Sequence, residues 1–430
     1  MPELPVTLDA LDAGSAAASL EVYESAMQGP SIAGIPVAFI LFALTLAGIA
    51  VFHRHTLRVA LCGLAAITAF KLAFTAFDGT PGLPGLAIHL AHEWVILANL
   101  FGLLVGFALL SDQFEKSRVP ELLPAILPDD WRGPAVLLLL VFLMSTFLDN
   151  IAAAIIGGTI AAAVFRQRVQ VGYLAALVAA SNAGGAGSVV GDTTTTMMWI
   201  EGVSPLDVAR AFLPAAVALA VLAVPAAFVQ QRHSPIVCEP PAGLRPDWPR
   251  VAVVILILAT VIATNVIVNT HFETWADRFP FLGVAVWLAL LATAAWRAPD
   301  WRRVPPAALG SVFLLSLVLC ASMMPVESLP DPSWPSAFGL GFVSAVFDNI
   351  PLTKLALEQG GYDWGALAFA VGFGGSMVWF GSSAGVALST QYPEARSVVA
   401  WLRSGWFVAL GYVAGFAAYL LLIGWRPESP

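Results

Sequence analysis

Long apolar segments alternate with short polar ones along most of the chain, and this pattern predicts membrane-spanning helices. A helix needs about 20 apolar residues to cross the hydrocarbon core of a bilayer. Runs of this kind fall in two groups, separated by a polar, proline-rich linker at residues 230–250. They are residues 31–52, 58–77, 93–111 and 207–229 in the first group, and 251–270, 279–296, 307–325 and 399–424 in the second.

Each group also contains two apolar segments that are interrupted in the middle. One is interrupted by an Asp-Asn-Ile tripeptide, and the next along the chain is interrupted by glycines. The four segments are residues 134–165 and 172–200 in the first group, and 335–357 and 364–390 in the second. Because the order of segments is the same in both groups, we interpret residues 31–229 and 251–424 as an internal repeat.

The first Asp-Asn-Ile segment is too long for a single crossing. As one helix, residues 134–165 would measure about 48 Å at about 1.5 Å per residue, whereas the hydrocarbon core is about 30 Å thick. Length alone would let residues 335–357 cross once. If both segments turn back, most Arg and Lys residues fall on one side of the membrane, whereas two crossings would divide them equally. The positive-inside rule therefore favours two re-entrant hairpins.

These assignments predict an all-α polytopic membrane protein with ten full spans, two re-entrant hairpins and two discontinuous helices. Each half then crosses the membrane an odd number of times, so the second repeat is inverted relative to the first. We expect both termini on the periplasmic side of a bacterial inner membrane and the linker 230–250 in the cytoplasm. Inverted repeats with discontinuous helices are typical of secondary transporters.

The composition supports a membrane location and excludes several classes of protein. The 430 residues are 59% hydrophobic and only 11% charged, whereas soluble proteins carry about 25% charged residues. Three scattered cysteines indicate neither a disulfide framework nor a zinc site. Residues 1–30 are acidic and lack the features of a signal peptide, so we expect a mostly disordered tail there and a short one at 425–430. No soluble-enzyme motif, phosphate loop or nucleic-acid-binding patch is visible, and we expect no enzymatic activity.

Acidic residues at the two expected hairpin tips are candidates for ion binding. Asp149 and Asp348 each precede an apolar helix, a position where Asp and Asn are favoured N-caps. A structural cap is the simpler interpretation. However, a carboxylate at membrane depth costs about 2.5–3.5 kcal/mol or more, and a neutral residue would cap without that cost. An acid at the same place in both repeats therefore favours a function, with Asn150 and Asn349 as neutral ligands.

Glycines interrupt the segment after each tip and predict unwound backbone. Each glycine inside a helix costs about 1 kcal/mol relative to alanine, and unwound backbone inside a membrane is tolerated only where it is buried or lines a cavity. Asp192 and the threonines after it would supply oxygen ligands, which suit hard cations; the second break has hydroxyls but no acid. The alternative is a glycine-rich packing face with threonines bonded to their own helix. The glycines expected at the breaks are Gly184, Gly185, Gly187, Gly374, Gly375 and Gly381.

The four interrupted segments together resemble the ion transporter superfamily. FLDNI with GGAGSVVGDTTT, and VFDNIPLT with GGSMVWFGSSAG, are similar to motifs of NhaD-type sodium/proton antiporters, with arsenite and citrate permeases as cousins. The resemblance covers residues 31–424 in architecture and is specific at these motifs. It implies a homodimer, a scaffold region and a mobile transport region. The departures are modest: Ala152 stands where the second repeat has Pro351, and the first tip lacks a lysine.

The resemblance also implies that each hairpin tip packs against the broken helix of its own repeat. The expected clusters are Asp149, Asn150, Asp192, Thr193, Thr194 and Thr195 in the first repeat, and Asp348, Asn349, Ser382 and Ser383 in the second. We expect Na⁺ as the transported ion at the Asp149/Asp192 cluster, and no cofactor. A desolvated carboxyl group can hold a proton or a cation, but hardly both. Competition at these aspartates would exchange a monovalent cation for protons by alternating access.

Three other functions compete with cation exchange. A cation-coupled citrate or carboxylate transporter and an arsenite-type permease would share the expected fold, although three acids at the site would repel an anion. An intramembrane aspartyl protease would use a GxGD motif, whereas residues 189–192 read Val-Val-Gly-Asp, and it would leave the third, repeat-matched aspartate unexplained.

A lysine lies inside the second expected hairpin and allows several interpretations. Lys354 either neutralises Asp348 or Asp192 as a charge partner, pairs with Glu358 four residues on, or extends outward to the membrane interface.

Four titratable residues outside the motifs carry less information. Lys71 lies inside the span 58–77, and its side chain either extends to the interface, which we expect, or has a buried partner that the sequence does not name. His89, His92 and Glu93 precede a span on the outer side, and we expect surface groups there rather than a metal site or pH sensor.

Overall fold

The computed structural model describes residues 29–52, 55–77, 79–237, 243–276 and 278–427. In this part of the chain the regular structure is helical except for two short antiparallel hairpins. They are β1 (Ser31–Ile32) with β2 (Ile35–Pro36), and β3 (Ala76–Phe77) with β4 (Thr80–Pro81). The expected tail at residues 1–30 lies almost wholly outside the described residues, as do the last residues of the expected tail at 425–430.

The helices of the first half follow the segments that the hydrophobic pattern predicts. They are α2 (Val37–Val51), α3 (Thr56–Phe74), α4 (Gly82–Glu115), α5 (Val119–Leu122), η1 (Leu123–Ile126), α6 (Arg132–Ser145), α7 (Asn150–Val164), α8 (Val171–Ala186), α9 (Thr193–Ile200), α10 (Pro205–Ala209) and α11 (Phe212–His233). The helix expected from residue 31 begins later, because the chain turns between β1 and β2 at Ala33 and Gly34, both with positive φ.

The second half repeats this order of long, interrupted and long helices. Its elements are α12 (Trp248–His271), α13 (Glu273–Ala276), α14 (Phe281–Ala294), η2 (Trp301–Arg303), α15 (Val304–Ser322), η3 (Val326–Ser328), α16 (Trp334–Ser344), α17 (Asn349–Gln359), α18 (Trp364–Gly374), η4 (Gly375–Met377), α19 (Ser383–Gln391), η5 (Pro393–Arg396), α20 (Val398–Ser404) and α21 (Trp406–Leu422).

Several helices are long and apolar enough to cross a membrane. By length and composition, the described residues contain five: Thr56–Phe74, Gly82–Glu115, Pro205–His233, Trp248–Val268 and Trp301–Ser322. A sixth candidate is the pair α20 and α21, which are bent by 61° relative to each other. The chain is therefore a multi-pass membrane protein.

The bend between α20 and α21 corrects the expectation of one continuous helix at residues 399–424. A Cβ added at Gly405 would lie 2.8 Å from the Ala175 Cβ of α8, which is tighter than van der Waals contact. Glycine therefore lets the bend approach the buried helix α8 closely, and the helix breaks at that point.

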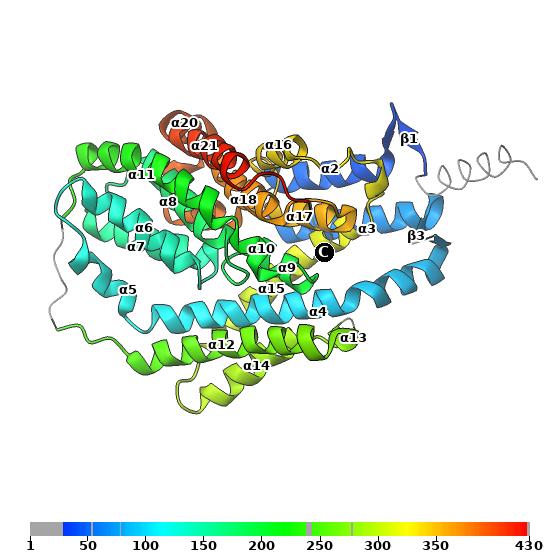
Figure 1. Ribbon diagram of the computed structural model, residues 1–430, viewed down its shortest axis with the longest axis horizontal. Helices are drawn as coiled ribbons and strands as arrows, with labels where there is room; N and C mark the ends of the chain where they lie inside the picture. Colours follow the sequence, from blue (N-terminus) through cyan, green and yellow to red (C-terminus); the bar gives the residue numbers. More distant parts are fainter. Residues whose placement is uncertain (1–28, 53–54, 78, 238–242, 277, 428–430) are drawn as a thin grey trace, which may run out of the picture.

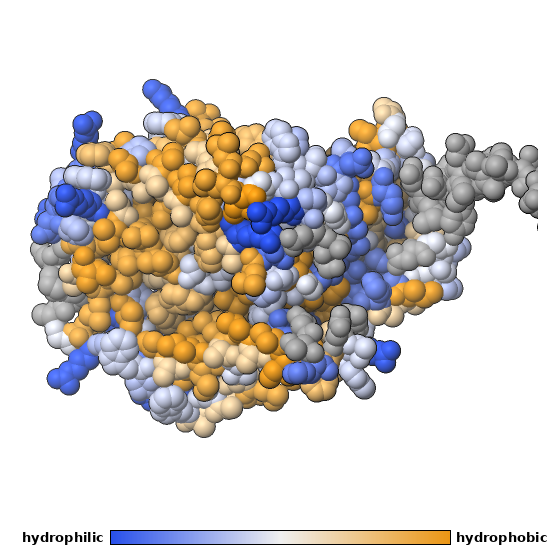
Figure 2. Space-filling model, in the orientation of Figure 1, coloured by the Kyte–Doolittle hydropathy of each residue, from blue (hydrophilic) through white to orange (hydrophobic). Residues whose placement is uncertain are grey.

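Apolar side chains cover much of the outside of the molecule. Figure 2 shows hydrophobic residues over much of the visible face, with hydrophilic residues along the left edge, in a patch near the middle and on the right. On α12, Ile255 is 61% exposed and Val266 is 55% exposed. Exposed apolar surface on this scale is unfavourable in water, and it suits contact with lipid.

The interrupted helices lie at the centre of the structure (Figure 1). Helix α8 packs against α6, α7, α11, α18 and α19. All residues of α18, and all of α8 after Val171, are buried. Helices buried on every side cannot show an amphipathic pattern, which explains why these two are almost uniformly apolar and rich in Ala and Gly.

Glycines let the interrupted helices approach their neighbours to backbone contact. A Cβ added at Gly184 would overlap the carbonyl oxygen of Phe142 in α6, and one at Gly374 would overlap the carbonyl oxygen of Gly341 in α16. Both halves thus have a glycine in contact with a neighbouring backbone at matching positions, and no other residue fits there.

We predict that Gly184→Ala lowers the free energy of unfolding by about 1–3 kcal/mol, because the added methyl group overpacks the contact between α8 and α6. The matched control is Gly339→Ala in α16, where an added Cβ meets nothing within 4 Å; it should be neutral or slightly stabilising. Thermal unfolding of both variants in detergent tests this, and equal melting temperatures would contradict the packing described here.

Candidate functional site

The tip between α6 and α7 contacts the break between α8 and α9. Asp149 is the N-cap of α7, and its Oδ2 accepts a hydrogen bond from the Ile151 amide at 3.2 Å. The next amide, of Asn150, donates to the Gly191 carbonyl oxygen in the break at 3.0 Å. The structure therefore places the first tip directly against the unwound backbone that precedes Asp192.

Asp192 caps the half-helix on the other side of that break. Its Oδ1 accepts a hydrogen bond from the Thr194 amide at 3.2 Å, and the residue is 3% exposed. Within the described part of the chain, neither Asp192 Oδ2 nor the Thr194 hydroxyl has a hydrogen-bond partner. Buried polar atoms are nearly always satisfied, so an unbonded carboxylate oxygen in this position is free to hold a proton or a cation.

The threonines that follow Asp192 make different contacts near the break. Thr193 lines a cavity. The hydroxyl of Thr195 donates to the Ser188 carbonyl oxygen at 2.6 Å, and that of Thr196 donates to the Val189 carbonyl oxygen at 2.9 Å. Thr195 and Thr196 therefore stabilise the unwound backbone, whereas the role of Thr193, Thr194 and Thr195 as ligands stays a prediction.

The second tip repeats this arrangement with a different residue at the break. Asp348 caps α17, with its Oδ1 3.0 Å from the Ile350 amide, and its Oδ2 accepts a hydrogen bond from the Ser383 hydroxyl at 3.4 Å. Ser382 caps α19 in the way that Asp192 caps α9. Asn349 is buried beside Asp348. The second group therefore has one carboxylate where the first has two.

Two residues that sequence reasoning did not select as ligands join the halves. Asn182 accepts a hydrogen bond from the Asn150 side-chain amide at 3.1 Å and donates one to the Ser376 hydroxyl at 2.9 Å. All three residues are buried. The available signal was an amide in an otherwise apolar helix, two residues before Gly184, but nothing in the sequence indicated that its partner would come from the other half.

A cavity at the first aspartate group reaches Ser383 of the second group. It measures about 230 Å³ and is lined by Asp149, Asp192, Thr193 and Ser383, with residues of α4 and α15 closing the other side. A second cavity of about 240 Å³ contains Asp348 and shares Ser383 with the first. The two clusters expected from the sequence are therefore neighbours and share one wall.

A third cavity approaches Asp149 from one end of the molecule. It measures about 360 Å³ and its lining includes Asp112, Glu115, Asp149 and Arg303. Asp112 is buried and bonds Lys116 at 2.8 Å and Arg303 at 3.3 Å. This cavity connects the first aspartate with a group of charged residues at the end of α4.

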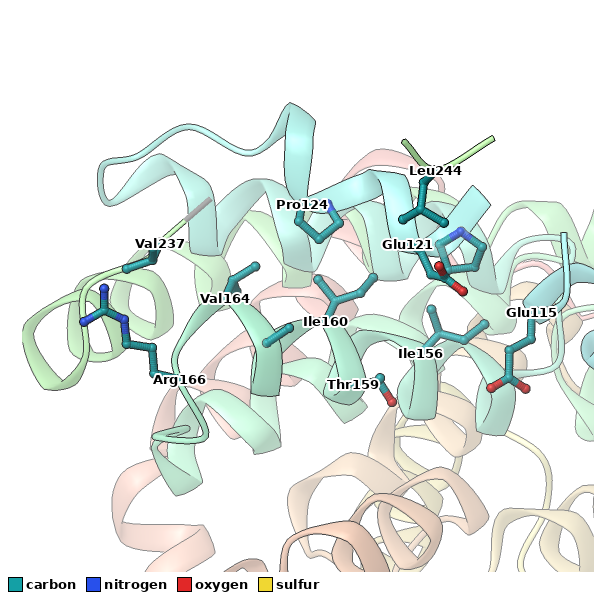
Figure 3. Close-up of a pocket in the computed structure, with 12 residues that line it drawn as sticks. Glu115, Glu121, Pro124, Ile156, Thr159, Ile160, Val164, Arg166, Val237 and Leu244 are labelled. Carbon is teal, nitrogen blue, oxygen red and sulfur yellow. The ribbon is translucent and has the colours of Figure 1, made fainter. Parts of the chain in front are cut away.

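A further pocket lies away from the aspartates (Figure 3). It measures about 460 Å³ and lies between one face of α7 and the region of α5 and η1, with Ile156, Ile160 and Val164 on the α7 side. None of the three aspartates lines it, so we do not assign it to the candidate site.

Lys354 pairs with glutamates. Its side chain is 2% exposed, and its Nζ lies 2.7 Å from Glu358, 2.7 Å from Glu201 and 3.2 Å from Glu93. Of the interpretations left open by the sequence, the pair with Glu358 is therefore present, and two further carboxylates join it. The side chain does not extend outward.

The expectation that His89 and Glu93 lie at the surface is wrong. They are 3% and 2% exposed, because they lie on a side of the long helix α4 that contacts Ser322 of α15 and Lys354 of α17. His89 Nε2 lies 3.0 Å from the Ser322 hydroxyl, whereas His92 is exposed. For Lys71 the alternative of a partner within the protein is present: its ammonium donates to the Met323 carbonyl oxygen at 2.9 Å.

Proteins similar to this chain include antiporters of plants and bacteria. Sodium/proton antiporter 1 of Arabidopsis thaliana is 27% identical over an alignment that covers 91% of this chain and 73% of that protein. The Na(+)/H(+) antiporter NhaD of Halomonas elongata is 26% identical over 66% of each chain. This chain is a distant homologue of sodium/proton antiporters, including the NhaD family. The NhaD antiporter of Vibrio cholerae, 27% identical over 66% of this chain and 69% of that protein, agrees with this result.

These relatives confirm the resemblance that the four motifs indicate. They are transporters by name and not enzymes. No protein-family model matches the chain.

We predict that Asn182→Ala destabilises the protein by about 1–3 kcal/mol, because it leaves the buried Asn150 amide and Ser376 hydroxyl without a partner. Thr260→Ala is a suitable control, since that hydroxyl is exposed on α12 and bonds only its own helix at 2.8 Å; its effect should stay within about 0.5 kcal/mol. The melting temperature in detergent measures both. A loss no larger for Asn182→Ala than for the control would argue against the polar bridge.

Proposed function

We propose that the protein is a secondary active transporter that exchanges a monovalent cation, Na⁺ in the simplest case, for protons by alternating access. The observation that carries the proposal is the buried, unbonded Oδ2 of Asp192 in a cavity shared with Asp149. The names of the relatives support Na⁺ and protons as the two ions.

The donor set around the cavity suits a hard cation as cargo. Carboxylate, amide, hydroxyl and backbone oxygens are preferred by ions such as Na⁺ over softer metals. Asp149, Asp192 and Asp348 would take the cation or proton. The neutral ligands would be drawn from Asn150, Asn349, Thr193, Thr194, Thr195, Ser382 and Ser383, with backbone groups exposed near Gly184, Gly185, Gly187, Gly374, Gly375 and Gly381.

Coupling follows from two opposing effects on the same carboxylates. Burial makes an uncompensated charge costly, so a carboxylate in the cavity needs either a proton or a cation. The first turns of α7, α9 and α17 start at these aspartates and direct amide donors toward them, which stabilises the ionised form. A site balanced in this way can give up a proton when a cation arrives, and each turnover then exchanges one for the other.

The proposed membrane arrangement is an inverted repeat of residues 31–229 and 251–424 with ten full crossings. Helices α6 and α16 have 14 and 11 residues, or about 21 Å and 17 Å, against a hydrocarbon core of about 30 Å. This supports α6–α7 and α16–α17 as re-entrant hairpins. The discontinuous helices would be α8–α9 and α18–α19.

The orientation and assembly belong to the same proposal. Four basic residues gather around polar partners at one end of α4. They are Lys116, Arg250, Arg297 and Arg303, and their partners are Asp112, Gln113 and Asp247. This concentration of Lys and Arg supports the end of α4 as cytoplasmic. Both termini would then be periplasmic, in a bacterial inner membrane. We include a homodimer, with a scaffold region and a mobile transport region, on the basis of the resemblance.

We predict that NaCl dissipates an imposed pH gradient in everted vesicles that contain the wild-type protein, and that Asp149→Asn abolishes this effect. Asparagine keeps the cap of α7 but cannot exchange a cation for a proton. Asp129→Asn removes an exposed carboxylate outside the site and should transport as the wild type does. If Na⁺ has no effect on wild-type vesicles, or Asp149→Asn still transports at the wild-type rate, the exchange proposal fails.

We also predict that Na⁺ stabilises the purified protein. A ligand at about 100 times its Kd adds about 2.7 kcal/mol to the free energy of unfolding, which raises the melting temperature. Asp192→Asn should lose most of this increase while it keeps the cap of α9. Choline chloride at the same ionic strength is the control. Equal stabilisation by both salts would exclude a specific cation site.

A further inference from the structure

A buried charge cluster on α4, α9 and α17 takes no part in the exchange described above. Lys354 of α17 lies at its centre, with Glu93 from α4, Glu201 from the end of α9 and Glu358 from α17 around it. An ammonium group has three donors, so one lysine can contact all three carboxylates. It cannot neutralise them, because three ionised carboxylates and one ammonium leave two negative charges.

The three carboxylates differ in their access to water. The side chains of Glu201 and Glu358 are 21% and 30% exposed, so water can solvate their charge. The side chain of Glu93 is 3% exposed and is the most distant from Lys354, with its oxygens 3.2 Å and 3.4 Å from Nζ. Its Oε2 accepts no hydrogen bond from the described residues.

The charge imbalance therefore falls on Glu93. A buried carboxyl group without sufficient compensation becomes neutral by binding a proton. The charged groups that act on it are Lys354, Glu358 and Glu201, from α17 and the end of α9. On its own helix, His89 lies one turn earlier and bonds Ser322 of α15, and His92 directly precedes Glu93 and is exposed. Of the three charged groups that act on Glu93, one, Lys354, is positive.

The cluster is joined through the backbone to both aspartate groups. Lys354 lies about 9 Å along α17 from Asp348, and Glu201 about 13 Å along α9 from Asp192, at about 1.5 Å per residue. Helices α9 and α17 also pack against each other. Lys354 thus ties the far ends of two aspartate-capped half-helices to α4 through its contacts with Glu201 and Glu93.

We propose that Glu93 is a proton-binding site of the protein, separate from the three aspartates and linked to them through Lys354. When Glu93 holds a proton, Lys354 is shared by Glu201 and Glu358 only. When the proton leaves, Glu93 competes for Lys354 and fastens α17 to α4. This inference rests on the proposed cation/proton exchange for its role in transport, whereas the protonation of Glu93 can be tested without transport.

Infrared difference spectroscopy of the purified full chain, titrated with alkali, tests the protonation directly. We expect the wild type to show a carbonyl-stretch band of a protonated carboxylic acid that is lost as the pH rises. Because the three aspartates can also hold protons and contribute to this band, its area is compared between variants. Glu93→Gln should lose the part of the area that Glu93 contributes, while Glu115→Gln, which removes an exposed carboxylate from the same helix, should keep the whole band. Glu93→Asp should show it at a shifted frequency, which covers the case in which Glu93→Gln does not fold. A band of the same area in wild-type and Glu93→Gln spectra would overturn the proposal.

The pH profile of exchange in proteoliposomes tests the link to transport. When one titrating group limits a rate, the rate changes about tenfold per pH unit on the side of the profile where that group titrates. The profile of Glu93→Gln should therefore be less steep than that of the wild type, by up to about tenfold per pH unit. An unchanged profile would overturn the assignment of Glu93 to transport. If Na⁺ drives no exchange in the wild type, the proposed function fails, but the infrared result still decides whether Glu93 carries a proton.

Discussion

The burial of aspartates at the starts of half-helices is the constraint on which this structure depends. A carboxylate inside a membrane protein needs compensation, and here it comes from the N-termini of half-helices in the protein interior. Asp149, Asp192 and Asp348 each cap such a helix. A continuous helix offers no free amide donors in its middle. The breaks after α8 and α18 and the tips before α7 and α17 supply such donors in the interior.

The interruptions themselves must be stabilised without water. Backbone groups at the first break are bonded by the hydroxyls of Thr195 and Thr196 and by the amide of Asn150. Glycines such as Gly184 bring the neighbouring helices close enough to exclude solvent. The same residues that make the helix break possible therefore also keep it packed against its neighbours. In the proposed exchange, such buried surroundings would make a proton and a cation compete for one carboxylate.

The sequence predicted the parts of this arrangement that repeat and missed those that depend on contacts between distant segments. The Asp-Asn-Ile tips and glycine breaks were visible because they occur twice in apolar surroundings. The bridge of Asn182 to Ser376 and the pairing of Lys354 with Glu93 and Glu201 were not, because the partners lie in different halves of the chain. Glu93 was placed at the surface because the start of α4 contains polar residues that a hydropathy window reads as a loop.

The most direct test of competition at Asp192 is proton release on cation binding. NaCl is added to the purified protein in weakly buffered detergent solution, and the pH is followed with an indicator dye. Competition predicts that the wild type releases protons with NaCl and not with choline chloride, and that Asp192→Asn releases markedly fewer. Sodium binding without proton release, shown by calorimetry on the same sample, would contradict the account.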